Sequence, residues 1–426
     1  MIQLQTLGGR LAAVCVAASL LAPSLPAQAL IGGDGQKRMT TVTEDRNTSC
    51  QIGTTAKVEQ APTAISLLGV KKAWQLSRGG KVKVAIVDSG VIASNVHLTE
   101  NVLPGTDLVD RGDGRTDLAG HGTAIAGQIA AHEVEGSGLV GLAPEAAILP
   151  VRVYTSDQHD AISAGKGPDG ARTAKGIVWA ADQGAKVIVV AQPSPTDLPE
   201  LKAAVEHATS SGALVVASAG DVPQDQQNKT EDPQAPRYPA AYSQALSVTA
   251  VDANGAPSDS VLHGEHVEVA APGSRVLSTF FGDGDCMFAG EKPTTSYATG
   301  YVAGVAALVV AKYPEETPAD WKHRILATAL RPSRSHRDKL IGWGIIAPYD
   351  ALGFVNDGSL EGPENPRFPA PTKQETPSLS PPEPEPDPRP ARTATLGITA
   401  GISCLAALAI LTASRLRGPS PKKPRE

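Results

Sequence analysis

The sequence has few cysteines and little net charge. Its formal charge is −6 over 426 residues, and the lysines and arginines do not gather into one patch. This argues against a nucleic-acid partner, because binding to a phosphate backbone needs a concentrated basic surface. No acidic loop has the ligand spacing of a calcium site, so we assign no metal and no cofactor.

The N-terminus has the pattern of a secretory signal. Residues 1–29 contain one basic residue, Arg10, followed by the apolar run LAAVCVAASLLA, and they end in Ala-Gln-Ala. We therefore expect a signal peptide that is cleaved after Ala29. An uncleaved anchor is the alternative, although the apolar run is short for a bilayer span.

The C-terminus has the pattern of a membrane anchor. Residues 393–414 carry no charge, and as a helix they would span roughly 33 Å, enough for the hydrocarbon core. The basic tail, residues 415–426, predicts a cytoplasmic C-terminus and an extracytoplasmic globule. Residues 356–392, rich in proline, read as an extended linker between globule and membrane. The alternative for 393–414 is a buried helix of a soluble protein.

Of the four cysteines, only two remain for the exported part. Cys15 lies in the expected signal and Cys404 in the expected anchor, which leaves Cys50 and Cys286. Outside the cytoplasm two thiols of one domain usually pair, so we expect a Cys50–Cys286 disulfide, with two free buried thiols as the alternative. The bond would stabilise the fold by on the order of 5 kcal/mol, an upper estimate from chain entropy.

Residues 63–355 alternate apolar runs typical of strands with helical stretches. The expected strands are 81–90, 146–154, 185–191, 213–220 and 245–252, and the expected helices are 123–132, 173–183 and 198–211. Near-continuous apolarity indicates strands buried on both faces, and strand–helix repetition indicates a parallel sheet covered by helices. The fold class is therefore α/β, and functional groups are expected outside the carboxyl ends of the strands.

Three segments carry residues suited to nucleophilic catalysis. In AIVDSGV, Asp88 is expected at the end of a buried strand. His121 lies between two glycines in GHGTAIAG, and Ser296 lies in TTSYATGYVAG. Each has a structural alternative: a turn-capping aspartate, a structural histidine and a helix N-cap serine. In the order aspartate, histidine, serine they supply an orienting acid, a base and a nucleophile.

These segments resemble the subtilisin-like serine proteases, peptidase family S8. VDSGV, HGTAIAG and TSYATGYVAG stand in that family's order, and GLAPEAAILPVRV and APGSRVLST are similar to its framework segments. With the signal, the stalk and the C-terminal helix, the chain is most similar to the membrane-anchored mycosins of type VII secretion. The resemblance implies a three-layer fold with a mainly parallel sheet, serine endopeptidase activity on peptides or proteins, and contact with a secretion membrane complex.

Several positions depart from the family pattern. Thr294 replaces the glycine before the Thr-Ser pair, and Gly300 replaces a proline in the helix. Asp221 stands where the family has an asparagine that donates to the oxyanion. Because an ionised carboxylate cannot donate, we expect a loss of roughly 10²–10³-fold in rate, unless the carboxyl is protonated. Asn228 is too far along its loop to replace it.

The expected substrate-binding edge also differs. Ala191, Gln192 and Pro193 stand where the family has Ser-Leu-Gly, and proline removes a backbone donor. The pocket between this segment and the facing residues should differ too; those residues are Ala217, Ser218, Ala219 and Gly220.

Two functions remain open. The intact triad favours an active endopeptidase, and the altered oxyanion position and substrate edge favour a weak or inactive domain that stabilises a secretion complex. Residues 30–62 are too short for the self-chaperoning pro-domain common in secreted subtilases. We expect them to form an arm around the globule, either as a surface strap or as a segment that restricts entry to the site.

Overall fold

A computed structural model describes residues 55–222, 235–369 and 389–416. The expected signal, Cys50, Asn228, most of the linker and most of the basic tail lie outside the described residues.

Seven parallel strands form the central sheet. Along the sheet the order is β2-β3-β1-β4-β5-β6-β7, and each neighbouring pair is parallel. The strands are β1 (Lys83–Asp88), β2 (Thr106–Asp107), β3 (Ala147–Arg152), β4 (Val187–Val190), β5 (Leu214–Ser218), β6 (Leu246–Val251) and β7 (Val269–Pro272). Strands β4 to β7 are buried throughout. The near-continuous apolar runs thus correspond to strands covered on both faces, as expected.

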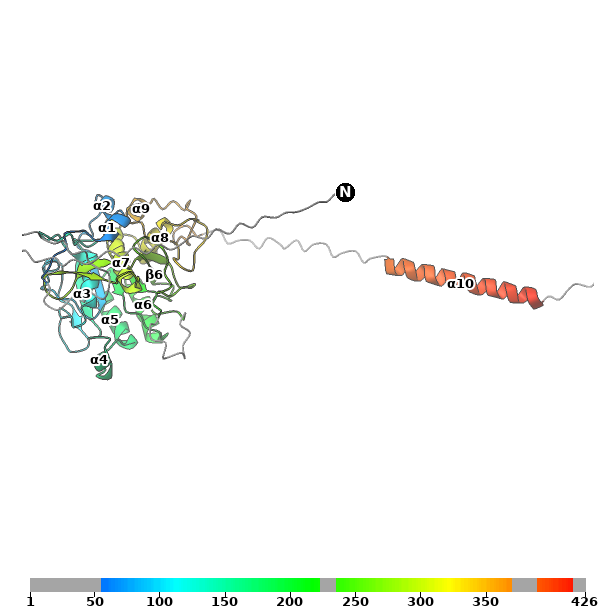
Figure 1. Ribbon diagram of the computed structural model, residues 1–426, viewed down its shortest axis with the longest axis horizontal. Coiled ribbons are helices and arrows are strands. Elements are labelled where there is room, and N and C mark those ends of the chain that lie inside the picture. The colour runs from blue at the N-terminus through cyan, green and yellow to red at the C-terminus, as the bar shows by residue number, and fades with distance from the viewer. Residues whose placement is uncertain (1–54, 223–234, 370–388, 417–426) are drawn as a thin grey trace, which may run out of the picture. The chain divides into compact units, whose positions relative to one another are not determined.

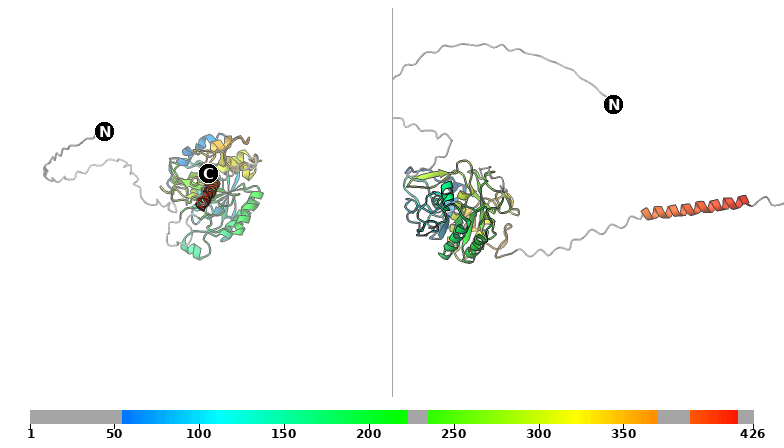
Figure 2. Two further views of the ribbon diagram at one scale, coloured as in Figure 1. Left: turned by 90° about the vertical axis from the view of Figure 1, so that its right-hand side faces the viewer. Right: turned by 90° about the horizontal axis from the view of Figure 1, so that it is seen from below.

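Helices cover both faces of the sheet (Figure 1). Helices α3 (His121–Ala130) and α7 (Thr295–Lys312) share one apolar core with the sheet. Helices α5 (Gly170–Asp182) and α6 (Pro199–Ser210) pack on each other and share the second core (Figure 2). The chain therefore has the expected three layers, with a sheet between two helical layers.

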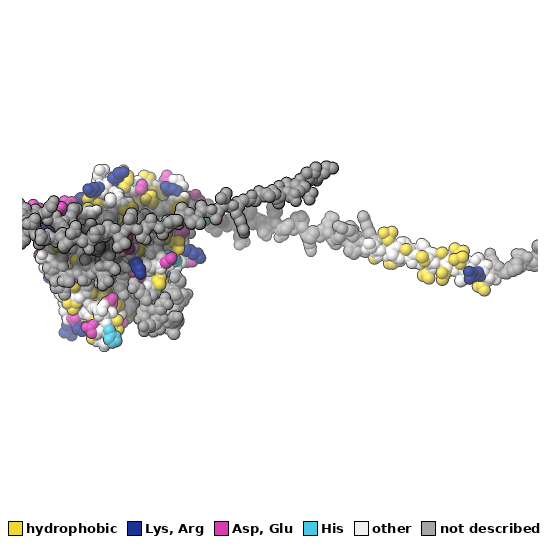
Figure 3. Space-filling view, viewed as in Figure 1, with side chains coloured by type: hydrophobic (Ala, Val, Ile, Leu, Met, Phe, Trp, Pro, Cys, Tyr) yellow, Lys and Arg dark blue, Asp and Glu magenta, His cyan; other side chains and the backbone are white. Residues whose placement is uncertain are grey.

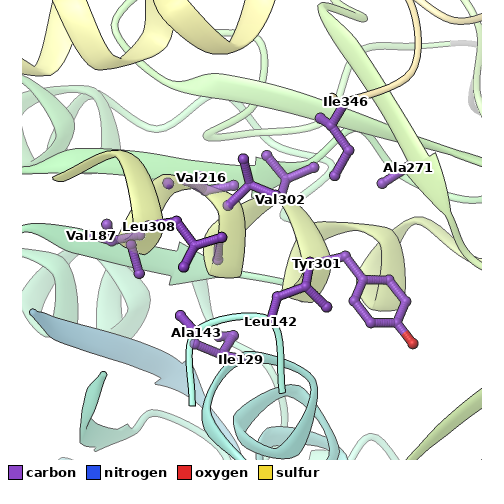
Figure 4. Close-up of a cluster of buried hydrophobic side chains, with 14 of the residues drawn as sticks. Ile129, Leu142, Ala143, Val187, Val216, Ala271, Tyr301, Val302, Leu308 and Ile346 are labelled. Carbon is purple, nitrogen blue, oxygen red and sulfur yellow. The ribbon is translucent and has the colours of Figure 1, made fainter. Parts of the chain in front are cut away.

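Helix α7 is the central element of the first core. Its residues are small and apolar on all sides, which suits a helix buried over most of its length. Leu308 and Val302 lie among valines of the sheet, including Val187 and Val216 (Figure 4). This packing fixes the direction in which the N-terminal turn of α7, with Ser296, points.

An antiparallel ribbon and several short helices complete the globule. The ribbon pairs β8 (Val276–Thr279) with β9 (Asp285–Phe288). The hydroxyls of Ser278 and Thr279 donate to the carbonyls of Ala124 and Thr123, which seats the ribbon on α3. The remaining helices are α1 (Thr63–Leu67), α2 (Val70–Ala73), α4 (His159–Ser163), α8 (Pro318–Thr328) and α9 (Pro348–Gly353).

Helix α10 (Arg389–Leu416) contains the expected apolar segment. Residues Thr393–Leu416 contain an 18-residue window with a mean hydropathy of 2.1 and are long and apolar enough to cross a membrane. Their side chains are exposed, and apolar side chains lie along the face of the helix that Figure 3 shows. A basic residue, Arg415, lies in the last turn.

Candidate active site

Asp88 ends β1 and is completely buried. Its Oδ1 accepts hydrogen bonds from the Ser89 N–H, the Tyr154 hydroxyl and the Nδ1–H of His121, each at 2.8 Å. Burial alone would raise the pKa of Asp88. The charge and hydrogen bond of His121, together with the donors of Ser89 and Tyr154, outweigh burial and hold the pKa below its usual value. The carboxyl is therefore ionised at neutral pH.

His121 is the first residue of α3, and its side chain is one-fifth exposed. Burial lowers its pKa, but the neighbouring Asp88 carboxylate outweighs this effect, so that the pKa lies above the usual value. Because Nδ1 donates to Asp88, the neutral imidazole keeps its lone pair on Nε2. That tautomer is the one required of a general base.

The residues on either side of His121 are glycines because a larger side chain at either position would collide with a neighbouring group. Gly120 has φ of 79°, and a Cβ on it would run into the ring of Phe280. A Cβ on Gly122 would run into the carbonyl of Gly90, in the turn after β1. The close approach of α3 to that turn is what brings His121 onto Asp88.

Asp117 holds the loop that leads into α3. Its buried carboxylate accepts from the N–H groups of Ala119, Gly120 and Thr123 and from the Thr123 hydroxyl. Burial raises the pKa of Asp117 in spite of these donors. The Asp117 side chain thus fixes the backbone that leads into His121.

Ser296 lies in the first turn of α7 and is half-buried. The N-cap of the helix is Thr294, so Ser296 does not take the capping role that is its structural alternative. The Ser296 hydroxyl lies 3.5 Å from the Thr294 hydroxyl, at the limit of a hydrogen bond. A hydrogen bond to His121 is not among those of the described residues, whereas the next residue, Tyr297, has its ring 5.9 Å from the His121 ring. Such looseness is common in free enzymes.

Asp221 follows β5 and contacts the start of α7. Its Oδ1 accepts from the Thr295 N–H at 2.8 Å and from the Thr295 hydroxyl at 2.9 Å. The same hydroxyl lies 2.6 Å from that of Ser218, within the buried interior. Burial raises the pKa of Asp221, while the bonds from Thr295 and the charge of His121 act in the opposite direction.

The two segments expected to bind substrate follow neighbouring strands. Strand β4 ends at Val190, which pairs with Ala217 of β5, so residues 191–193 and 217–220 emerge side by side. Ser194 is paired with Tyr238 through two backbone hydrogen bonds, so the chain after Pro193 turns to another partner. Gly220 has φ of 100° and packs against the side chain of Arg237.

A pocket of about 200 Å³ adjoins His121. Its lining combines Gln192 of the expected substrate edge with aromatic and acidic groups; these are Tyr154, Asp157, Phe280, Phe288 and Tyr297. The aromatic rings contact one another, with Phe280 5.5 Å from Phe288 and Phe288 5.3 Å from Tyr297 between ring centres. The pocket therefore combines a wall of aromatic rings with polar groups beside the imidazole.

The two substitutions next to the nucleophile are accommodated. Thr294 has φ of −123°, a backbone conformation that any residue adopts, so its side chain introduces no strain. Gly300 has a packing role that we had not expected. A Cβ there would come within 2.6 Å of the Gln128 side chain, whose amide donates to the Tyr297 carbonyl at 2.8 Å.

Cys286 of β9 is 2% exposed, and its expected partner Cys50 lies outside the described residues. Among the described residues, no group of three or more His, Cys, Asp or Glu side chains is placed to hold a metal ion.

Sequence reasoning missed Tyr154, Asp117 and the aromatic residues of the pocket. The signal for Asp117 was its position four residues before His121, in a turn sequence. Tyr154 had no such signal, because it reaches Asp88 only through the adjacency of β3 and β1.

Comparison with known proteins confirms the resemblance. The Subtilase family model matches residues 79–344. Mycosin-1 of Mycobacterium tuberculosis (strain ATCC 25618 / H37Rv) is 32% identical over 381 residues, which cover 80% of this chain and 84% of that protein. Thermitase of Thermoactinomyces vulgaris is 38% identical over 241 residues, or 57% of this chain and 79% of that protein.

Solved structures agree. MycP1 from the ESX-1 type VII secretion system superposes with a TM-score of 0.61 at 28% identity, covering 74% of this chain and 92% of that chain. A chain of an intact ESX-5 inner membrane complex gives a TM-score of 0.59 at 30% identity, covering 83% of this chain and 90% of that chain.

Proposed function

Because this chain belongs to the subtilase family and is similar to mycosins over most of its length, we propose that it is a membrane-anchored serine endopeptidase with Ser296 as nucleophile. The observation that carries the proposal is the 2.8 Å bond between Asp88 and the Nδ1 of His121. It leaves Nε2 as the basic atom beside the first turn of α7. The one-fifth exposure of the His121 side chain supports a catalytic rather than a purely structural histidine.

Hydrolysis proceeds in two acyl-transfer steps. His121 Nε2 takes the proton of the Ser296 hydroxyl while the Ser296 oxygen bonds to the substrate carbonyl carbon. Asp88 stabilises the imidazolium that forms. His121 then gives that proton to the leaving amine as the C–N bond breaks. Water repeats the sequence on the acyl-enzyme and releases the acid.

We place the catalytic domain outside the cytoplasm, next to a type VII secretion complex. The apolar segment Thr393–Leu416 and the basic tail support an anchor with a cytoplasmic end, and the likeness to a chain of the ESX-5 complex supports the partner. Deleting residues 393–426 should move the protein from the membrane fraction to the soluble fraction, and the complex should no longer co-purify with it.

One observation favours a second function. Asp221 places a carboxyl beside the nucleophile's turn, where an ionised oxygen opposes a developing oxyanion. A domain with little or no activity that stabilises the membrane complex would tolerate that substitution.

Covalent labelling distinguishes the two functions. Full-length protein in detergent is incubated with a fluorophosphonate probe, and the labelled peptide is identified. We expect labelling at Ser296 that is lost in Ser296→Ala. Ser163→Ala is the matched control, because Ser163 lies 3.4 Å from His159 on an exposed helix and belongs to no triad. A folded protein that remains unlabelled would favour the structural function.

A further inference from the structure

The inference concerns the Asp221 carboxyl and rests on the proposed endopeptidase function. Asp221 has one oxygen, Oδ1, fully engaged by the two donors of Thr295. Thr295 is itself buried and is held by Ser218 through the 2.6 Å contact of their hydroxyls. The carboxyl is therefore fixed in orientation, with Oδ1 directed at the residue that precedes the nucleophile.

The fixed position of Oδ1 determines what Oδ2 can do. A carboxyl and a carboxamide have the same shape, so Oδ2 stands where an asparagine in this orientation would present its NH₂ group. Asp221 is half-buried, and within the described residues Oδ2 is not among the buried atoms that lack a partner. An ionised Oδ2 offers no proton, whereas a protonated Oδ2 is a strong donor to an oxyanion.

Several groups around Asp221 influence its charge. The bonds from Thr295, the start of α7 and a positively charged His121 favour the carboxylate, and burial favours the neutral acid. Arg237 packs against Gly220, His266 lies 3.3 Å from the Ala219 carbonyl, and His263 follows Leu262, which pairs with Gly220. Burial prevails, and the pKa of Asp221 lies above its usual value.

We propose that Asp221 is a proton-gated oxyanion donor, so that hydrolysis proceeds only from molecules in which Asp221 is protonated and His121 is neutral. When Ser296 attacks, the carbonyl oxygen becomes the oxyanion and accepts from the Ser296 N–H and from Oδ2–H of Asp221. The attacking proton travels through His121 to the leaving amine. Asp221 keeps its own proton throughout, so its acid form acts as a donor and not as a proton-transfer group.

This pairing of protonation states is a minority form at every pH, because an imidazole loses its proton at higher pH than a carboxyl does. The intact triad therefore coexists with a low rate at neutral pH. Above the pKa of Asp221, the protonated fraction falls tenfold for each pH unit. Because the neutral fraction of His121 rises over the same range, the rate stays level up to the pKa of His121 and falls above it.

The test compares Asp221→Asn with the natural protein between pH 4 and pH 9. Full-length protein in detergent is assayed for kcat/KM on a peptide ester and for the rate of fluorophosphonate labelling at Ser296. We expect the natural protein to show a bell-shaped profile, and Asp221→Asn to rise to a plateau as His121 loses its proton. The ratio of variant to natural rate should grow about tenfold per pH unit above the Asp221 pKa.

Asp221→Ala is the second variant, because it removes the donor at every pH. The natural protein should exceed it by up to roughly 10²-fold at acidic pH, and this advantage should disappear at alkaline pH. An Asn-to-natural ratio that is constant across the pH range would overturn the inference, as would an Ala variant equal to the natural protein at pH 5. If Ser296 is labelled in none of the folded proteins, the proposed function itself fails, and the inference with it.

Discussion

His97 Nε2 lies 3.0 Å from Asp285 Oδ1, and both side chains are completely buried. The other oxygen of Asp285 accepts from the Ser137 hydroxyl at 2.6 Å and from the Val58 N–H at 2.8 Å. The Asp285 N–H in turn donates to the Ala56 carbonyl. The last part of the N-terminal arm is thus fastened to β9, which supports the surface-strap interpretation for residues 55–58.

Asp285→Asn should destabilise the protein by about 1.5–3 kcal/mol at neutral pH, because it replaces a charged acceptor that serves three donors. Burial would raise the pKa of Asp285, but His97, Ser137 and Val58 outweigh it and lower the pKa. A lowered native pKa means that the stabilisation is complete above the unfolded value of about 3.9 and is lost as the pH falls through the native pKa. Urea unfolding of the variant and the natural protein at pH 7 and near pH 3 measures the loss of stability and its dependence on pH.

Asp283→Asn is the matched control for the Asp285 substitution. Asp283 is exposed and lies two residues before Asp285, in the loop that leads into β9. The free energy of unfolding of the Asp283→Asn variant should therefore differ from that of the natural protein by less than about 0.5 kcal/mol. A difference between Asp285→Asn and the natural protein that is the same at both pH values would contradict the lowered pKa of Asp285.

Tyr154→Phe should reduce kcat about tenfold and leave KM unchanged. The Tyr154 hydroxyl donates to Asp88 Oδ1 at 2.8 Å and lies 3.3 Å from His121 Nδ1, so it orients the pair without reaching the substrate bond. Tenfold corresponds to one hydrogen bond to a charged group, about 1.5 kcal/mol. Peptide-ester kinetics give the two parameters separately.

Tyr242→Phe controls for the loss of a tyrosine hydroxyl in general. Tyr242 donates to Asp197 at 2.7 Å, outside the triad. It should lower the stability as Tyr154→Phe does but leave kcat unchanged. Equal effects of both variants on kcat would show that Tyr154 acts through stability alone.

Gly127→Ala should destabilise the protein by about 1–3 kcal/mol, since a Cβ at this position would run into Ser278 and Thr279. These two residues seat β8 on α3, and Phe280 follows them directly. Gly80→Ala is the control, because a Cβ there meets nothing within 4 Å. In thermal unfolding, the Gly80→Ala variant should unfold at the same temperature as the natural protein. If the Gly127→Ala variant does so too, the β8–β9 ribbon can shift away from α3 without loss of stability.

The long buried elements could be predicted from the sequence because their signal is local. Strands β1, β3, β4, β5 and β6 and helices α3, α5 and α6 lie within a few residues of the expected bounds. Strand β2 has two residues, too few for a period to be recognised. The order of the strands in the sheet is likewise absent from any local pattern, and it is this order that puts Tyr154 beside Asp88.

The start of α7 shows the same limit at the site. Three successive hydroxyl residues, Thr294, Thr295 and Ser296, are equally good caps by sequence. The structure leaves the Thr294 side chain without a capping bond and satisfies the first N–H of the helix with Asp221, from the end of β5. A contact between residues 74 positions apart cannot be read from the local pattern, although the segments that meet there were predicted correctly.

The Cys50–Cys286 disulfide stays a prediction, and the position of β9 makes it specific. Asp285 forms hydrogen bonds with Ala56 and Val58, so only five residues lie between Cys50 and a point already beside Cys286. Non-reducing peptide mapping should recover a linked peptide, and reduction should lower the stability by about 2–5 kcal/mol. Cys404 is a free cysteine that lies in the expected membrane span, so it is the internal control and should react with an alkylating agent after denaturation without a reductant. If Cys50 and Cys286 are alkylated as readily as Cys404, the arm is held by hydrogen bonds alone.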